Sequence, residues 1–164
     1  TDNYNSRTKI LSLSQSTAQS TSVAAIGVAA HECGHAVQDA VGYSPLKLRA
    51  AIVPVANIGS SLAMPLILIG LLISGDSGNM IINLGLLAFS MAFVFQLVTL
   101  PVEFNASKRA LTILSEGGLL TKEEVPMARR VLFAAALTYV AAAIATLLQL
   151  LRLVILFGNN NRRQ

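Results

Sequence analysis

The chain has 164 residues, of which 54% are hydrophobic and 12% are charged, and its formal net charge is +4. Soluble domains carry about 25% charged residues, so this composition excludes an ordinary soluble fold and favours one that faces lipid. Its basic residues are scattered without interleaved aromatics, which excludes a typical nucleic-acid interface, and its single cysteine excludes an internal disulfide.

The N-terminal part predicts a small β region followed by one helix. Residues 8–14 alternate polar with apolar side chains and predict a short strand within a strand-and-loop region, 1–21. This strand is either an ordinary one or an edge to which an extended substrate peptide adds by main-chain pairing. Residues 22–41 predict a helix whose first turn is capped by Ser20 or Thr21.

The remaining chain predicts a mainly α membrane protein forming a single domain over its whole length. Residues 51–73 and 80–102 are uncharged and long enough to cross a hydrocarbon core of about 30 Å. The polar loop 74–79 between them makes the pair a transmembrane hairpin. Residues 103–130 predict a polar, partly helical connector, and 131–157 predict a third long apolar helix that spans the membrane.

The chain's only two histidines lie in one HEXXH pattern, His31-Glu32-Cys33-Gly34-His35. Residues four apart share a helix face, so both imidazoles can reach one Zn²⁺. In metalloproteases with this motif the glutamate is the general base and not a ligand. The pattern therefore predicts one Zn²⁺ per chain and a catalytic Glu32; the alternative is a chance match. Cys33 points about 100° away from its neighbours and is expected to pack.

A catalytic zinc needs a third protein ligand, which must be acidic here because no histidine remains. The acidic residues weighed are Asp2, Asp39, Asp76, Glu103, Glu116, Glu123 and Glu124. Topology favours Glu103, which follows the returning span on the membrane side that carries the histidines. Asp76 is a bilayer away, and Asp39 is an awkward ligand on the same helix. The alternative for Glu103 is a solvated acid paired with Lys108 or Arg109.

Five segments of the chain closely resemble the bacterial neutral zinc metallopeptidases of the YugP type. The resemblance covers nearly the whole chain and is carried by segments 28–38, 42–46, 53–60, 100–110 and 135–142. More remotely, the histidine pair followed by Glu-Phe-x-Ala resembles HtpX and the CAAX prenyl proteases.

The resemblance implies zinc ligation by His31, His35 and Glu103, with Glu32 as the catalytic acid/base. The remote relatives carry an aspartate four residues after the ligand glutamate, where this chain has Ser107. Members of the family also begin with an N-terminal spanning helix and a short domain. We therefore expect this chain to be a fragment of a longer protein.

Two further side chains are candidates for stabilising an oxyanion. A phenol such as Tyr139 or a guanidinium such as Arg109 can donate a hydrogen bond to the developing charge. The alternatives are a packing aromatic at the membrane interface for Tyr139 and an interfacial positive charge for Arg109.

The expected function is zinc-dependent endopeptidase action on peptide or protein substrates, membrane proteins among them, within a lipid bilayer. The alternative is a non-proteolytic zinc-binding membrane module for assembly or quality control, which would have no need of a base at Glu32. A site-2-type intramembrane protease is disfavoured because no span contains an aspartate. A metal transporter is disfavoured because Arg152 is the one ionisable residue within the spans.

Charge asymmetry predicts the orientation. Seven basic residues flank the histidine side of the hairpin: Lys47, Arg49, Lys108, Arg109, Lys122, Arg129 and Arg130. The loop 74–79 has none, so the positive-inside rule places the zinc site at the cytoplasmic face of the inner membrane. Arg162 and Arg163 oppose this orientation if the third helix crosses fully.

Overall fold

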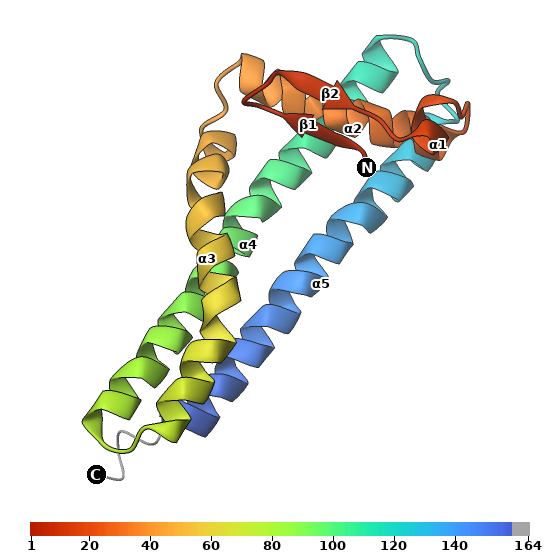
Figure 1. The fold of residues 1–164 in the computed structure, drawn as a ribbon. Coiled ribbons are helices and arrows are strands. Elements are labelled where there is room, and N and C mark those ends of the chain that lie inside the picture. Colours follow the sequence, from red (N-terminus) through yellow and green to blue (C-terminus); the bar gives the residue numbers. More distant parts are fainter. Residues whose placement is uncertain (159–164) are drawn as a thin grey trace. The chain divides into compact units, whose positions relative to one another are not determined.

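The structure is a computed structural model that describes residues 1–158 and contains a short β-hairpin and five helices within them. The elements are β1 Asn3–Asn5, β2 Ile10–Ser12, α1 Gln15–Ala18, α2 Val23–Ala40, α3 Ser44–Leu72, α4 Asp76–Glu116 and α5 Val125–Phe157 (Figure 1). Helices α3, α4 and α5 are long and apolar enough to cross a membrane. The prediction of a mainly α membrane protein with a small N-terminal β region is confirmed. Arg162 and Arg163 lie outside the described residues.

The N-terminal region differs in detail from the prediction. Strand β2 covers only part of 8–14 and pairs antiparallel with β1, with Tyr4 opposite Leu11. The expected loop after it contains the single turn α1. The cap of α2 is Ser22, which accepts a hydrogen bond from the Ala25 N–H. The prediction of Ser20 or Thr21 is wrong because a capping side chain must stand directly before the first helical residue to reach that N–H.

Helix α4 extends well beyond the predicted end of the second span at residue 102. It continues through Pro101 to Glu116, so the first half of the expected connector is helix. A proline removes one backbone hydrogen bond, and neighbouring groups can compensate for that loss in membrane helices. Glu103 therefore projects from a regular helix, within the connector that the sequence predicted to be partly helical. Helix α3 likewise begins earlier than the predicted span, at Ser44, and α5 begins at Val125, ahead of its apolar part 131–157.

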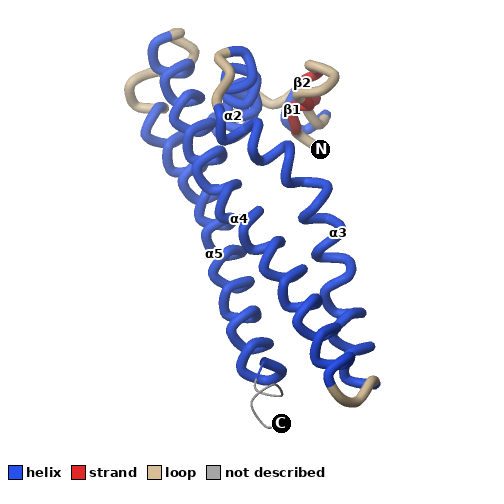
Figure 2. Tube along the Cα trace, turned by 90° about the vertical axis from the view of Figure 1, so that its left-hand side faces the viewer, coloured by secondary structure: helices blue, strands red, loops and turns tan. Residues whose placement is uncertain are grey.

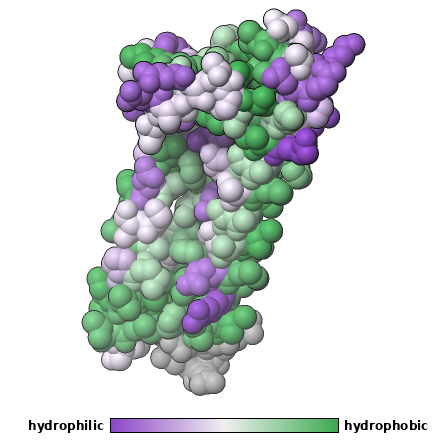
Figure 3. Space-filling view, turned by 90° about the vertical axis from the view of Figure 1, so that its right-hand side faces the viewer, coloured by the Kyte–Doolittle hydropathy of each residue, from purple (hydrophilic) through white to green (hydrophobic). Residues whose placement is uncertain are grey.

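The chain divides into two compact units. Unit 1 contains residues 1–47 and 99–139, and unit 2 contains residues 48–98 and those from 140 onward. In unit 2, the hairpin halves of α3 and α4 run side by side (Figure 2). A Cβ on Gly59 would lie 2.7 Å from the Ala88 carbonyl oxygen, so the two backbones are in close contact. Small residues allow such approach between helices in lipid, and the long helices present a mainly apolar surface (Figure 3).

In unit 1, parts of α2, α4 and α5 pack around a small apolar core. Its buried members are Ala30, Ala110, Leu114, Leu120, Ala128 and Leu132. The turn before α5 is closed by a reciprocal cap in which the Thr121 N–H donates to Glu124 and the Glu124 N–H donates to the Thr121 hydroxyl. This core fixes the two helices that carry the histidines and Glu103.

Candidate metal centre

A glycine brings the histidine helix against the helix that carries Glu103. Gly34 is buried on α2, and a Cβ there would overlap the backbone carbonyl of Ala106 on α4. Only glycine, which has no side chain, permits this approach. The contact lies between His31 and His35 in sequence and three residues from Glu103. Gly34 therefore permits the close contact of α2 with α4, a position that the sequence reasoning did not single out.

The approach of α2 and α4 gathers both histidines around one carboxylate. The Nε2 of His31 lies 2.8 Å from Glu103 Oε2, and the Nε2 of His35 lies 3.4 Å from Glu103 Oε1. One ligand-type atom from each residue lies within 4.8 Å of the other two, and Glu103 is 3% exposed. Ligands at about 2.0–2.1 Å from a tetrahedral zinc lie roughly 3.3 Å from one another. The donor types and their spacing therefore fit a zinc ion.

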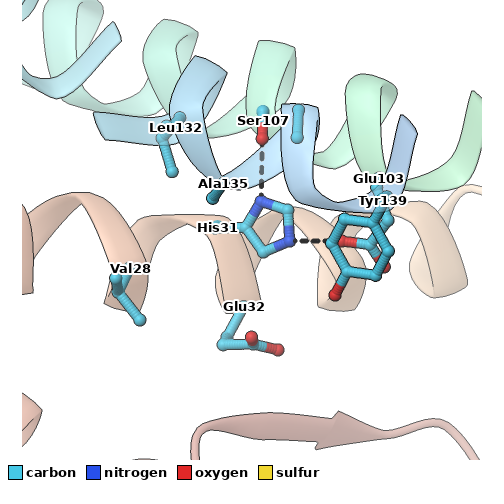
Figure 4. Close-up of a pocket in the computed structure, with 9 residues that line it drawn as sticks. Val28, His31, Glu32, Glu103, Ser107, Leu132, Ala135 and Tyr139 are labelled. Atoms are coloured by element: carbon cyan, nitrogen blue, oxygen red, sulfur yellow. Dashed lines mark hydrogen bonds and ion pairs between the residues drawn. The ribbon is translucent and has the colours of Figure 1, made fainter. Parts of the chain in front are cut away.

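Glu32 and Tyr139 line the same pocket as His31 and Glu103 (Figure 4). The cavity has a volume of about 170 Å³. Its remaining walls are Val28, Ser107, Leu132, Ala135 and Ala136. Burial raises the pKa of the Glu32 carboxyl above its ordinary value, against the opposing pull of His35 and His31. A carboxylate and a phenol thus stand beside the cluster in a largely apolar pocket.

Each histidine makes a second contact through its other ring nitrogen. The Nδ1 of His31 lies 2.9 Å from the Ser107 hydroxyl (Figure 4). The Nδ1 of His35 lies 2.9 Å from Oε1 of the buried Gln38. Such outer contacts orient metal-binding imidazoles. The sequence reasoning missed Gln38, because its place three residues after His35 does not by itself distinguish it from an ordinary helical glutamine.

The other predicted site residues lie elsewhere. Arg109 does not line the pocket; its Nε donates to Asn105 Oδ1 at 2.7 Å, and its guanidinium carbon lies 5.6 Å from the centre of the Tyr43 ring. Cys33 is exposed. Among the described residues, His31, His35 and Glu103 form the one group of such side chains spaced to hold a metal, so Asp2, Asp39, Asp76, Glu116, Glu123 and Glu124 stand outside it.

Asp39 instead ties the β-hairpin to α2, one turn beyond His35. Its Oδ2 accepts hydrogen bonds from the Tyr4 hydroxyl at 2.7 Å and from Lys9 Nζ at 2.6 Å. The bond from Lys9 and then that from Tyr4 lower the pKa of Asp39, while the bond to Asp39 raises the pKa of Tyr4. Lys9 itself lies in the turn between β1 and β2, in the left-handed region at φ 60°.

The described residues thus combine three helices long and apolar enough to cross a membrane with a largely buried His-His-Glu cluster that could hold a metal ion. A family described as "Putative neutral zinc metallopeptidase" matches residues 1–158, and the chain belongs to this family, which implies zinc as its metal. The chain is 45% identical over 159 residues to "Putative membrane protease YugP" of Bacillus subtilis (strain 168), covering 97% of this chain and 69% of that protein. No solved structure gives a significant match.

Proposed function

We propose that this chain is a zinc-dependent membrane endopeptidase with one Zn²⁺ held by His31, His35 and Glu103. The observation that carries the proposal is the convergence of these three side chains, from two helices, on one buried point. Zinc bound there would supply a Lewis acid that polarises a peptide carbonyl and makes water more acidic. The fourth position needed for catalysis would open toward the pocket that contains Glu32.

Glu32 and Tyr139 are the proposed catalytic residues. Glu32 takes a proton from the attacking water and returns it to the leaving amine, as its place in the pocket beside His31 allows. Tyr139 donates a hydrogen bond from its phenol to the oxyanion. Its position in the same pocket supports this role, whereas the contacts of Arg109 with Asn105 and Tyr43 argue against Arg109 as the donor.

The metal content of purified protein tests the proposal. We expect about one zinc per wild-type chain and its loss in Glu103→Ala, because two protein ligands hold zinc much less tightly than three. Glu116→Ala is the matched control, since it removes an exposed acid from the same helix outside the cluster. Full retention of zinc in Glu103→Ala would remove Glu103 from the site.

We further propose that the zinc site faces the cytoplasm, since seven basic residues flank the histidine side of the hairpin in sequence and the loop 74–79, which contains Ser77, has none. The test introduces Ser77→Cys in a Cys33→Ser background, because Cys33 is exposed and would otherwise react. An impermeant thiol reagent should label Cys at position 77 on intact cells. Labelling only after lysis would reverse the orientation.

A further inference from the structure

A chain of polar contacts leads from the buried His35 and Gln38 to the partly buried Asn105 and Arg109. The side chain of Gln38 is fully buried, and its Oε1 lies 2.9 Å from His35 Nδ1. Its Nε2 donates to the Val102 carbonyl at 2.8 Å and to Asn105 Oδ1 at 3.1 Å. The same Asn105 oxygen accepts from Arg109 Nε at 2.7 Å.

The direction of every bond in this chain follows from its last member. A guanidinium can only donate hydrogen bonds, so Asn105 must turn its oxygen toward Arg109. The second hydrogen bond to that oxygen must then come from the NH₂ group of Gln38. With its nitrogen committed to Asn105, Gln38 has only its carbonyl oxygen left for His35.

The backbone gives the same answer independently. The Val102 carbonyl is also an acceptor only, and it too faces the Gln38 nitrogen. Rotating the Gln38 amide by half a turn would place its oxygen against the oxygens of Val102 and Asn105. In a fully buried side chain that loss would leave unpaired polar groups. The amide of Gln38 is therefore fixed in one orientation.

His31 has no such constraint. Its Nδ1 faces the Ser107 hydroxyl, which can donate or accept by rotating its hydrogen. Its Nε2 is 2.8 Å from the Glu103 carboxylate, whereas the Nε2 of His35 is 3.4 Å away. Glu103 thus lies closer to His31, whose other partner, the Ser107 hydroxyl, can either donate or accept a hydrogen bond.

We propose that Arg109, Asn105 and Gln38 are positioning residues that fix the tautomer of His35, so that Nδ1 carries the proton and Nε2 presents its lone pair to the metal. The tautomer of His31, by contrast, is set by Glu103, and its proton moves to Nδ1 when a metal binds at Nε2. The consequence for metal binding rests on the proposed function, but the tautomers themselves do not. The two histidines differ in the chain without metal, with Nδ1–H on His35 and Nε2–H on His31.

Nitrogen-15 NMR of the full chain in detergent micelles, labelled only at histidine, reads both tautomers directly because the chain has two histidines. Burial lowers the pKa of His35, but its interactions with neighbouring groups, with Glu103 first, outweigh burial and raise it above the ordinary value, so the spectra are recorded in alkaline solution, at about pH 9 or above, until the signals no longer change with pH. The metal-free wild type should then give one set of signals for an Nδ1–H histidine and one for an Nε2–H histidine. Gln38→Met removes the acceptor at nearly constant shape and should shift His35 toward Nε2–H. An Nε2–H signal for His35 in the wild type, or an unchanged His35 signal in Gln38→Met, overturns the proposal.

The far end of the chain provides a second pair of variants at a position that is only partly buried. Arg109→Met should loosen the tautomer of His35, while Arg109→Lys should retain it, because an ammonium also only donates. Arg130→Met on the exposed face of α5 is the control. Equal His35 signals in Arg109→Met and Arg109→Lys would remove Arg109 from the relay, even if Gln38→Met fails to fold.

Zinc affinity, measured by chelator competition, completes the test. Gln38→Met and Arg109→Met should bind zinc about 10- to 100-fold more weakly, and Arg109→Lys close to wild type. A wild-type chain that binds no zinc would refute the proposed function and leave the tautomer result standing. Conversely, normal affinity in Gln38→Met with a shifted His35 tautomer would refute the link between the relay and the metal.

Discussion

Both compact units bring a glycine against the backbone of α4, but the surroundings of the two glycines differ. Gly34 meets Ala106 in unit 1, and Gly59 meets Ala88 in unit 2. The buried polar residues among those that the structure describes all belong to unit 1: His35, Gln38, Thr99 and Glu103. Around Gly59 the buried neighbours on α3 are Ala56 and Ala63.

The comparison separates two uses of close helix contact. Buried polar groups are costly unless they are paired, so unit 1 depends on each partner standing in its place. In unit 2 the contact contributes packing between apolar surfaces, where shape alone decides the outcome. Substitutions in unit 1 should therefore change chemistry and metal binding before stability, and those in unit 2 should do the reverse.

The largest separation of chemistry from stability is expected at Glu32. Glu32→Gln keeps the shape of the side chain and removes the proton acceptor, so cleavage should fall by about 10²- to 10⁴-fold with zinc content unchanged. Turnover of any peptide that the wild type cleaves, with metal analysis of the same samples, measures both. Undiminished turnover would refute the role of Glu32, and loss of zinc would show that the variant perturbs the cluster.

Gly34→Ala should come next, because its added methyl overlaps the Ala106 backbone and must displace α2 from α4. A displacement of about 1 Å can cost about 10²-fold in rate, and zinc affinity should fall as well. Gly27→Ala on the same helix is the control, since its Cβ would lie 3.9 Å from Ala128 Cβ, an ordinary contact. Equal zinc affinity in the two variants would contradict the role given to Gly34.

The same exchange in unit 2 should act on stability instead. Gly59→Ala places a Cβ 2.7 Å from the Ala88 carbonyl oxygen and should cost about 1–3 kcal/mol of unfolding free energy through overpacking. Thermal unfolding in detergent, followed together with zinc content per folded chain, separates the two effects. A Gly59→Ala variant that unfolds normally but loses zinc would break the distinction between the units.

Whether the sequence alone predicted a feature depends on how far apart along the chain the residues that determine it lie. The long apolar helices and the His31–His35 pair follow from local composition and spacing, and Glu103 followed from topology. The cap at Ser22 was missed, and the unbroken course of α4 to Glu116 was predicted only as a partly helical connector, because each depends on backbone geometry at single residues.

Gly34 and Gln38 were missed for a different reason. Their importance lies in contacts with Ala106, Val102 and Asn105, which are more than sixty residues away in the chain. A glycine inside a helix and a glutamine near its end have ordinary local explanations, so no pattern within α2 distinguishes them. Only the approach of α2 to α4 gives these two residues their partners.

The smallest effect is expected at Asp39, whose partly exposed carboxylate ties the β-hairpin to α2. Asp39→Asn weakens its bonds with Tyr4 and Lys9, so hydrogen exchange of the β1 and β2 amides should quicken by about two- to fivefold, with zinc content unchanged. Glu123→Gln, an exposed acid outside the hairpin, is the control. Equal exchange in the two variants would show that this contact does not hold the hairpin.

The dependence of this contact on pH has a definite sign. Because the pKa of Asp39 is lowered in the folded chain, the contact contributes at every pH above the ordinary aspartate value and is lost as the pH falls through the lowered one. Wild-type exchange, corrected for its intrinsic rate, should thus approach that of Asp39→Asn only in acid.

The addition of a substrate peptide to the 8–14 strand stays a prediction, and it requires a hairpin attached in this way. If substrate peptides do add to this strand, Asp39→Asn should also raise KM for peptides. An unchanged KM would show that substrates bind elsewhere.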